Sequence, residues 1–382
     1  MNVLIDNTGF KNKGAELMLL SAMQGFKEFI DDSSLFAIHG KPSYHIKGLY
    51  SITNQTRQNG VPLKQIPSLI KKNVFGLFDI DNIDLVLDVG GFRYSDKFDD
   101  IFDDKKIRSL KKYYQDLKSN GVKVILMPQA FGGFSTEKSK SLMIEIYPFF
   151  DLIFARDEES YKHLSTVVGK RDNILMYPDF TAIYNVDVDR SFRKKYNHLE
   201  EAICIIPNYK MINYGSDFEA NNYIEFMRKV TKLIVGQGYK VFLLNHEGDE
   251  DERVIKSIAQ FSDLNIEVVT KVNAKEAKWL IGRSKLCVSS RYHGVVNALS
   301  QGTPCFCTSW SHKYITLMKE YGFVDGVLNI SENDNSIHKV LNLLGDSSLF
   351  NSTKMKIEKG HVRTKEKVVD MWLAISENIK AS

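Results

Sequence analysis

The chain has 382 residues, 43% hydrophobic and 26% charged, which is typical of a globular protein long enough for two domains. Its 51 basic and 47 acidic residues leave a formal net charge of +4, too small a balance to predict a nucleic-acid partner. No apolar run approaches the roughly 18 residues of a membrane-spanning helix. The first ten residues lack the basic region and the cleavage site of a signal peptide. We therefore expect a cytoplasmic protein.

Strand-like and helix-like segments alternate through the first half of the chain. Apolar runs predict strands, and helical spacing predicts a helix from about residue 14 and a charged helix over 105–119. This alternation is typical of a mainly parallel sheet covered by helices. The predicted strands are 2–8, 83–89, 122–128, 152–156 and 173–178.

Residues 42–78 interrupt this pattern because they mix basic, aromatic and polar residues with little periodicity. A loop of this length is usually functional or mobile. Two interpretations stay open: a segment that contacts an acceptor or a membrane surface, and a solvated excursion with short helices.

The alternation restarts after the polar segment 187–200, which we interpret as a linker. The fold class we predict is α/β, with two Rossmann-like lobes and a central cleft between them. The N-terminal lobe spans 1–190, and the C-terminal lobe spans 191–360. A helix within 361–382 packs back on the lobes. The strands predicted for the second half are 202–208, 239–245, 266–270, 285–290 and 303–309.

Four cysteines lie inside apolar runs and lack the paired spacing of a zinc site: Cys204, Cys287, Cys305 and Cys307. We expect buried, reduced thiols, with a metal or redox role as the alternative. No pair of acidic residues has the spacing of metal ligands either, so no metal site is predicted.

Three loops that follow predicted strands carry residues suited to a small anionic ligand. The backbone N–H groups of the first loop, residues 7–19, can hold an oxyanion, although tight turns use the same residues. A glycine pair after the strand 83–89 permits close approach of the backbone to a ligand. The arginine that ends the predicted strand 152–156 either binds an anion or braces the next helix. These candidate residues are Asn7, Gly9, Gly14, Gly90, Gly91 and Arg156.

The motif SSRYHG, residues 289–294, combines an arginine and a histidine where a buried strand becomes a helix. Helix N-termini at the carboxyl ends of strands attract anions. Arginine matches carboxylates and phosphates bidentately, and histidine changes charge near neutral pH. We expect Arg291 to clamp an anion and His293 to act as a general acid.

Several separated motifs, taken together and in order, make the chain resemble the polysaccharide pyruvyltransferase family. They are NTGFKNKGAELML (7–19), LDVGGF (87–92), MPQAFGGF (127–134), ARDEES (155–160), YPDF (177–180), SSRYHGVVNALSQGTPCF (289–306) and SWSHKY (309–314). One departure is Phe92, which stands where the family often has a third glycine.

The resemblance implies a fold similar to the GT-B glycosyltransferases and a phosphoenolpyruvate donor, with no other cofactor. It also implies an acceptor sugar on a cell-surface polysaccharide or its lipid-linked precursor, which would bring the protein to the inner face of the membrane. The N-terminal lobe, 1–190, would then be the acceptor side, and the C-terminal lobe, 191–360, the donor side. Pyruvate forms a ketal across two hydroxyls and phosphate leaves. Arg291 and His293 match the family's positions for donor binding and catalysis, and Ser290, Gly294 and Lys313 complete the expected site.

Two other functions stay open at this point. A GT-B-like glycosyltransferase would use the same fold to bind a nucleotide sugar, whose diphosphate also lies at a helix N-terminus. A non-catalytic module would bind a glycan or an anion without turnover.

Overall fold

The computed structural model describes residues 1–40, 46, 48–52, 57–58, 61–62, 66–94, 104–260, 266–309, 311 and 313–381. The chain divides into two compact units. Unit 1 comprises Met1–Gly9, Met18–Phe180 and Lys367–Ser382, and unit 2 comprises Phe10–Leu17 and Thr181–Glu366. The chain therefore passes between the units at Phe180, before the predicted boundary at residue 190. Residues 10–17 belong to unit 2 although they lie near the N-terminus.

Unit 1 is built on a parallel sheet whose order is β10-β9-β8-β7-β1-β2-β3-β6 within the described residues. The central strands are apolar and fully buried, as expected for a sheet covered on both faces. The strands are β1 (Asn2–Asp6), β2 (Leu35–His39), β3 (Leu49–Ile52), β6 (Leu77–Phe78), β7 (Leu85–Asp88), β8 (Lys123–Gln129), β9 (Leu152–Ala155) and β10 (Ile174–Met176). A separate antiparallel pair joins β4 (Arg57–Gln58) and β5 (Val61–Pro62).

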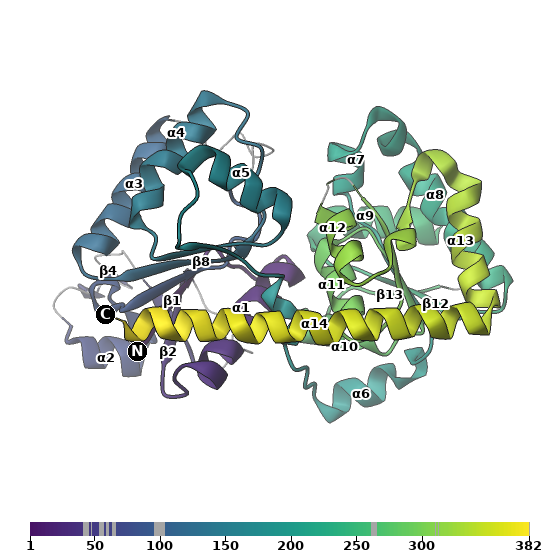
Figure 1. The fold of residues 1–382 in the computed structure, drawn as a ribbon. Coiled ribbons are helices and arrows are strands. Elements are labelled where there is room, and N and C mark those ends of the chain that lie inside the picture. Colours follow the sequence, from purple (N-terminus) through teal and green to yellow (C-terminus); the bar gives the residue numbers. More distant parts are fainter. Residues whose placement is uncertain are drawn as a thin grey trace. The chain divides into compact units, whose positions relative to one another are not determined.

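Helices cover both faces of this sheet. Figure 1 shows α3 (Asp104–Ser119), α4 (Glu137–Ile146) and α5 (Glu158–Val168) on one face. The helix α1 (Lys13–Phe29) follows β1, and its Gly25 packs against Trp372. This tryptophan belongs to α14 (Ser347–Lys380), whose last residues are part of unit 1. The expected C-terminal helix is thus real, but it begins earlier than residue 361.

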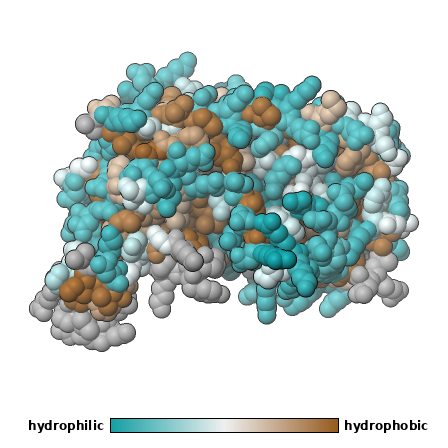
Figure 2. Space-filling model, turned by 90° about the horizontal axis from the view of Figure 1, so that it is seen from below, coloured by the Kyte–Doolittle hydropathy of each residue, from teal (hydrophilic) through white to brown (hydrophobic). Residues whose placement is uncertain are grey.

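The short helix α2 (Ser68–Phe75) lies inside the stretch 42–78. Strands β3 and β6 also lie there, so part of the expected irregular loop is regular structure, and the remainder falls outside the described residues. The exposed side chains of α2 include Ile70, Val74 and Phe75. Figure 2 shows one face of the molecule, on which hydrophobic residues lie among hydrophilic ones.

Unit 2 contains a second parallel sheet, with the order β13-β12-β11-β14-β15-β16 in the described part of the chain. Its strands are β11 (Ile203–Ile206), β12 (Val241–Leu244), β13 (Glu267–Val269), β14 (Leu286–Ser289), β15 (Cys305–Thr308) and β16 (Val327–Leu328). Its helices include α6 (Arg190–Tyr196), α7 (Lys210–Tyr214), α8 (Asp217–Gly236), α9 (Gly248–Ala259), α10 (Ala274–Gly282), α11 (Tyr292–Leu299), α12 (Lys313–Glu320), α13 (Asn333–Gly345) and the first part of α14, up to Glu366. Helix α8 packs against α9 and α13, and α10 packs against α11.

The segment 187–200 is not an exposed linker. It forms α6 and a following 3₁₀ turn, and both Tyr196 and Leu199 are buried in the core of unit 2. We predicted a linker here because the segment is polar. The polar residues are instead the exposed face of a helix that buries only a few large side chains.

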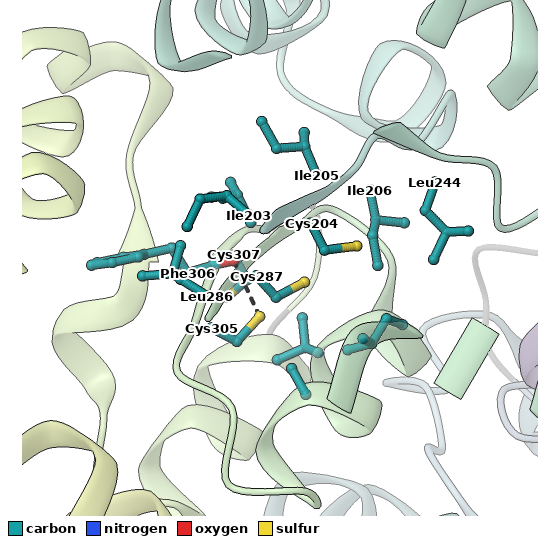
Figure 3. Close-up of a cluster of buried hydrophobic side chains, with 14 of the residues drawn as sticks. Ile203, Cys204, Ile205, Ile206, Leu244, Leu286, Cys287, Cys305, Phe306 and Cys307 are labelled. Atoms are coloured by element: carbon teal, nitrogen blue, oxygen red, sulfur yellow. Dashed lines mark hydrogen bonds between the residues drawn. The ribbon is translucent and has the colours of Figure 1, made fainter. Parts of the chain in front are cut away.

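The four cysteines are buried free thiols in the core of unit 2, as predicted. Cys204 pairs in register with Cys287, and Cys287 pairs with Cys305, so three thiols form a row across β11, β14 and β15. Figure 3 shows their sulfur atoms among the apolar side chains of this core. Within the described residues, no group of three or more His, Cys, Asp or Glu side chains is placed to hold a metal ion.

Candidate functional site

The motif SSRYHG lies where the sheet of unit 2 reverses its winding direction. The chain proceeds outward from β11 through β12 to β13, and outward on the other side from β14 through β15 to β16. Strands β11 and β14 are neighbours, and their last residues, Ile206 and Ser289, pair in register. Open α/β sheets bind ligands at such a point, beyond the carboxyl ends of the two strands. The sequence motif therefore lies at the position in unit 2 where a ligand is expected.

Helix α11 begins at Tyr292, with Arg291 as its N-terminal cap residue in extended conformation. The Ser289 hydroxyl accepts a hydrogen bond from the Arg291 N–H at 3.1 Å and donates one to the Arg291 carbonyl at 2.9 Å. A Cβ on Gly294 would lie 2.4 Å from this hydroxyl, so only glycine fits there. Gly294 thus shapes the turn that presents His293.

Ser290 is part of the framework. Its hydroxyl accepts hydrogen bonds from Tyr223 and Thr308, both at 2.7 Å, and its carbonyl accepts from Asn208 and Tyr314. The residue is fully buried, so the structure places it behind the site, where it fixes the end of β14.

The Arg291 guanidinium donates to carboxylates of the chain itself. Its Nε donates to Asp251 Oδ2 at 2.8 Å and its Nη2 to Asp251 Oδ1 at 2.5 Å, while Nη1 pairs with Glu247. Burial raises the pKa of Asp251, and the charge of Arg291 opposes this shift. A bidentate pair of this kind orients both side chains strongly. The predicted anion clamp is therefore held by two carboxylates of the chain itself, and neither was predicted as part of the site.

The spacing of Glu247 and Asp251 is the one feature of the sequence that could have indicated their shared contact with Arg291. Glu247 and Asp251 are four residues apart around the start of α9, so they lie on one face of the helix. Glu247 is the N-cap residue, yet its side chain makes no capping hydrogen bond. It contacts Arg291 instead.

His293 packs against the start of α1, which follows the loop after β1. A Cβ added to Gly14 would lie only 2.2 Å from His293 Nδ1, so the glycine lets the imidazole pack against the start of α1. The Asn12 side chain accepts a hydrogen bond from the Gly14 N–H at 2.8 Å, and the Lys13 N–H donates to the His246 carbonyl at 3.2 Å. The structure thus brings together Gly14 and His293, two residues predicted from distant parts of the sequence.

A second histidine lies near Arg291 and His293. His246 follows β12, is 1% exposed, and neither of its ring nitrogens has a hydrogen-bond partner among the described residues. Burial lowers the pKa of His246 well below its usual value, and the nearby Arg291, His293 and Lys13 lower it further. This imidazole is therefore neutral at neutral pH.

Lys313 adds a positive charge beside the motif. It begins α12, is 8% exposed, and its Nζ lies 5.2 Å from the centre of the Tyr292 ring. The Tyr292 ring in turn packs edge-on against the His293 ring at 5.5 Å. Lys313, Tyr292 and His293 therefore form a continuous row of contacts at the start of α11.

The other predicted residues lie in unit 1. Asn7 has a left-handed backbone (φ 57°), and a Cβ on Gly90 would lie 3.1 Å from the Cβ of Asn7, so the loops after β1 and β7 are adjacent. Gly9 lies in the first of these loops, and Gly91 packs near Met18. Arg156 is buried, and its Nη1 lies 3.5 Å from Asp179 Oδ2. Their roles as ligand-binding residues stay predictions.

With this geometry in place, comparison with known proteins decides the family. The model of the family described as polysaccharide pyruvyl transferase matches residues 12–312, most of the chain. The chain belongs to this family. The resemblance predicted from the sequence is confirmed, and so is the expectation of a transferase enzyme. No curated protein matches the chain significantly by sequence.

Solved structures agree on the fold of this pyruvyl transferase family member. It is similar to Anabaena HepE in complex with UDP-glucose, at 13% identity with all of both chains covered and a TM-score of 0.60. It is similar to the N-terminal domain of Candida albicans trehalose-6-phosphate phosphatase, at 10% identity over 100% of this chain and 97% of that one, with a TM-score of 0.60. It is also similar to the Neisseria meningitidis UDP-GlcNAc 2-epimerase, at 12% identity over all of both chains, with a TM-score of 0.59. At such identities the similarity concerns the fold alone, and it confirms two Rossmann-like lobes of the GT-B kind.

None of the helices in the described part of the chain is both long enough and apolar enough to span a membrane.

Proposed function

We propose that this pyruvyl transferase takes pyruvate from phosphoenolpyruvate and transfers it to a sugar of a cell-surface polysaccharide or of its lipid-linked precursor. The product is a pyruvate ketal across two hydroxyls, and phosphate is released. The observation that carries the proposal is the placement of His293 at the winding reversal of unit 2, packed against Gly14 and joined through Tyr292 to the buried Lys313.

The chemistry needs one proton donor and one site for a highly charged anion. A proton added to the methylene carbon of the enol phosphate makes the neighbouring carbon an oxocarbenium-like centre. The first sugar hydroxyl attacks that carbon, phosphate leaves, and the second hydroxyl closes the ring. Of the two hydroxyl protons, one balances the proton now on the methyl carbon and the other leaves with phosphate.

In this proposal His293 is the general acid and recovers its proton from the attacking hydroxyl. Lys313 attracts the phosphate or carboxylate of the donor. The neutral His246 lies beside them, and neither of its ring nitrogens has a hydrogen-bond partner among the described residues. No further cofactor takes part.

Arg291 acts in this scheme as a positioning residue. Its salt bridges with Asp251 and Glu247 join α9 to the turn before α11 and so fix the direction in which His293 leaves the helix. Removing one partner of a buried pair of this kind would leave an uncompensated charge.

The test measures phosphate release and product mass together. Purified protein is incubated with phosphoenolpyruvate and a panel of acceptor glycans, and in a parallel reaction with nucleotide sugars. We expect phosphate release and a glycan heavier by one pyruvate ketal, both lost in His293→Ala while the protein stays folded. Release of nucleotide from a nucleotide sugar, with no ketal from phosphoenolpyruvate, would refute the proposal in favour of a glycosyltransferase.

A further inference from the structure

The sheet of unit 1 also reverses its winding direction, and it does so between β1 and β7. The chain proceeds outward from β1 through β2 and β3 on one side, and from β7 through β8, β9 and β10 on the other. The last residues of the two strands, Asp6 and Asp88, pair in register. Asp6 and Asp88 therefore lie side by side at the carboxyl-end edge of this sheet.

The two carboxylates differ in how their oxygens are used. Asp88 is fully buried and accepts hydrogen bonds from the Gly90 N–H at 2.9 Å and the Tyr114 hydroxyl at 3.0 Å. Burial raises the pKa of Asp88, and Arg93 opposes this shift. Asp88 is therefore part of the framework.

Asp6 lies closer to the surface and is held by Tyr113. The Tyr113 hydroxyl donates to Asp6 Oδ2 at 3.0 Å, and the Asn7 N–H donates to Oδ1 at 2.7 Å. His39, the last residue of β2, has its Nε2 3.4 Å from the Tyr113 hydroxyl and 4.0 Å from Asp6 Oδ1. These three side chains form a polar group that reaches solvent through His39.

A pocket of about 370 Å³ opens beside this group, and His39 and Tyr113 form part of its wall. The volume is within the roughly 300–1,000 Å³ of small-molecule sites. The other polar side chains of the wall are Asp81, Asp116, Ser119 and Asn120.

The charge of this wall separates it from the site in unit 2. Among the described residues that line it there is no lysine or arginine, whereas two carboxylates are present. One of these, Asp116, pairs with Lys112 at 2.9 Å, which leaves Asp81 and the nearby Asp6 to repel an anion such as phosphoenolpyruvate. Hydroxyl, amide, imidazole and carboxylate groups beside an aromatic ring suit a neutral molecule with several hydroxyls.

We infer that this pocket binds a sugar through its hydroxyls, with His39 and Tyr113 as direct partners and Asp6 holding Tyr113 in place. That the sugar is the acceptor of pyruvate rests on the proposed function. Binding of a sugar here does not.

The experiment measures binding of neutral glycosides to the full chain in the absence of phosphoenolpyruvate. The probes are methyl β-galactopyranoside, methyl β-glucopyranoside and methyl β-mannopyranoside, detected by saturation-transfer NMR. Tyr113→Phe removes the hydroxyl that contacts His39 and Asp6, and His39→Ala removes the other direct partner. The matched control is Tyr147→Phe, which also removes a tyrosine hydrogen bond in unit 1, to Asn173, without touching the pocket.

We expect at least one glycoside to bind, with a Kd about fivefold weaker in Tyr113→Phe, the size of one lost hydrogen bond. Tyr147→Phe binds as the wild type does, and phosphoenolpyruvate does not displace the glycoside. The inference is overturned if none of the three probes binds, if both pocket variants bind like the wild type, or if phosphoenolpyruvate competes. If the protein binds a glycoside but releases nucleotide from a nucleotide sugar and forms no ketal from phosphoenolpyruvate, the proposed function is refuted and this inference stands.

Discussion

Gly14 and His293 are in direct contact, 279 positions apart in the sequence (293 − 14), and no Cβ fits between them. The contact lies within unit 2, because residues 10–17 belong to that unit although the rest of α1 belongs to unit 1. A glycine near the N-terminus thereby sets the position of a histidine in the second half of the chain. The orientation of the proposed general acid depends on this contact.

Replacing Gly14 with alanine should therefore lower kcat without unfolding the protein. The added Cβ displaces the His293 ring, and loss of a positioned acid costs about 100-fold or more in rate. Phosphate release gives kcat, and thermal unfolding reports the fold. Gly236→Ala is the control, since no atom lies within 4 Å of its Cβ position. Wild-type kcat in Gly14→Ala would show that this contact does not position the acid.

Replacing Lys313 with methionine should raise the KM for phosphoenolpyruvate. Methionine keeps much of the packing against Tyr292 but removes the charge, and a hydrogen bond to a charged group is worth about 1.5–3 kcal/mol, or roughly tenfold or more in affinity. Steady-state kinetics with varied donor measure the effect. Lys313→Arg, which keeps the charge, should recover part of the loss. An unchanged KM in the methionine variant contradicts a role for Lys313 in donor binding.

Asp251→Ala should destabilise the protein strongly because the buried charge of Arg291 loses its bidentate carboxylate partner. Removing one member of a buried pair costs about 3–5 kcal/mol. Urea unfolding gives the free energy of unfolding. Asp249, an exposed acid in the first turn of the same helix, is the matched control, and Asp249→Ala should cost less than about 1 kcal/mol. Equal losses in the two variants would show that the Arg291 salt bridge does not stabilise unit 2.

Because His246 is buried, we expect the free energy of unfolding to decrease in mild acid. Its pKa is lowered by burial in the folded protein, so below about pH 6.5 the unfolded chain binds a proton that the folded chain does not. His246 thus contributes stability above that pH, and the contribution is lost as the pH falls, by up to about 1.4 kcal/mol per pH unit. The slope of unfolding free energy against pH should be shallower in His246→Gln. The exposed Asn335→Gln, which changes a side chain that does not titrate, should retain the wild-type slope. Equal slopes in all three proteins would contradict the buried, neutral state of His246.

Much of the fold could be predicted from the sequence because each central strand is a short apolar run that ends in a glycine or a polar residue. The runs at β7, β8 and β14 are examples, since both faces of their sheets are covered. The division of the chain was harder to predict. Residues 10–17 join unit 2 through contacts with His246, Glu247 and His293, and such long-range contacts leave no local pattern.

The candidate site shows the same limit. The motif around Arg291 and His293 was visible because its residue types suit an anion, but the partners of Arg291 were not. Asp251 and Glu247 look like ordinary acids at the start of a helix, where the helix dipole already favours them. Only the adjacency of β12, β11 and β14 brings them to the arginine.

The most direct test of the account is the mass of the glycan product formed from phosphoenolpyruvate in heavy water. If His293 donates a solvent-exchanged proton to the methylene carbon, the pyruvate ketal carries one deuterium in its methyl group, and His293→Ala forms no ketal. A ketal whose methyl group contains no deuterium, or full ketal formation by His293→Ala, would contradict the assignment of His293 as the acid.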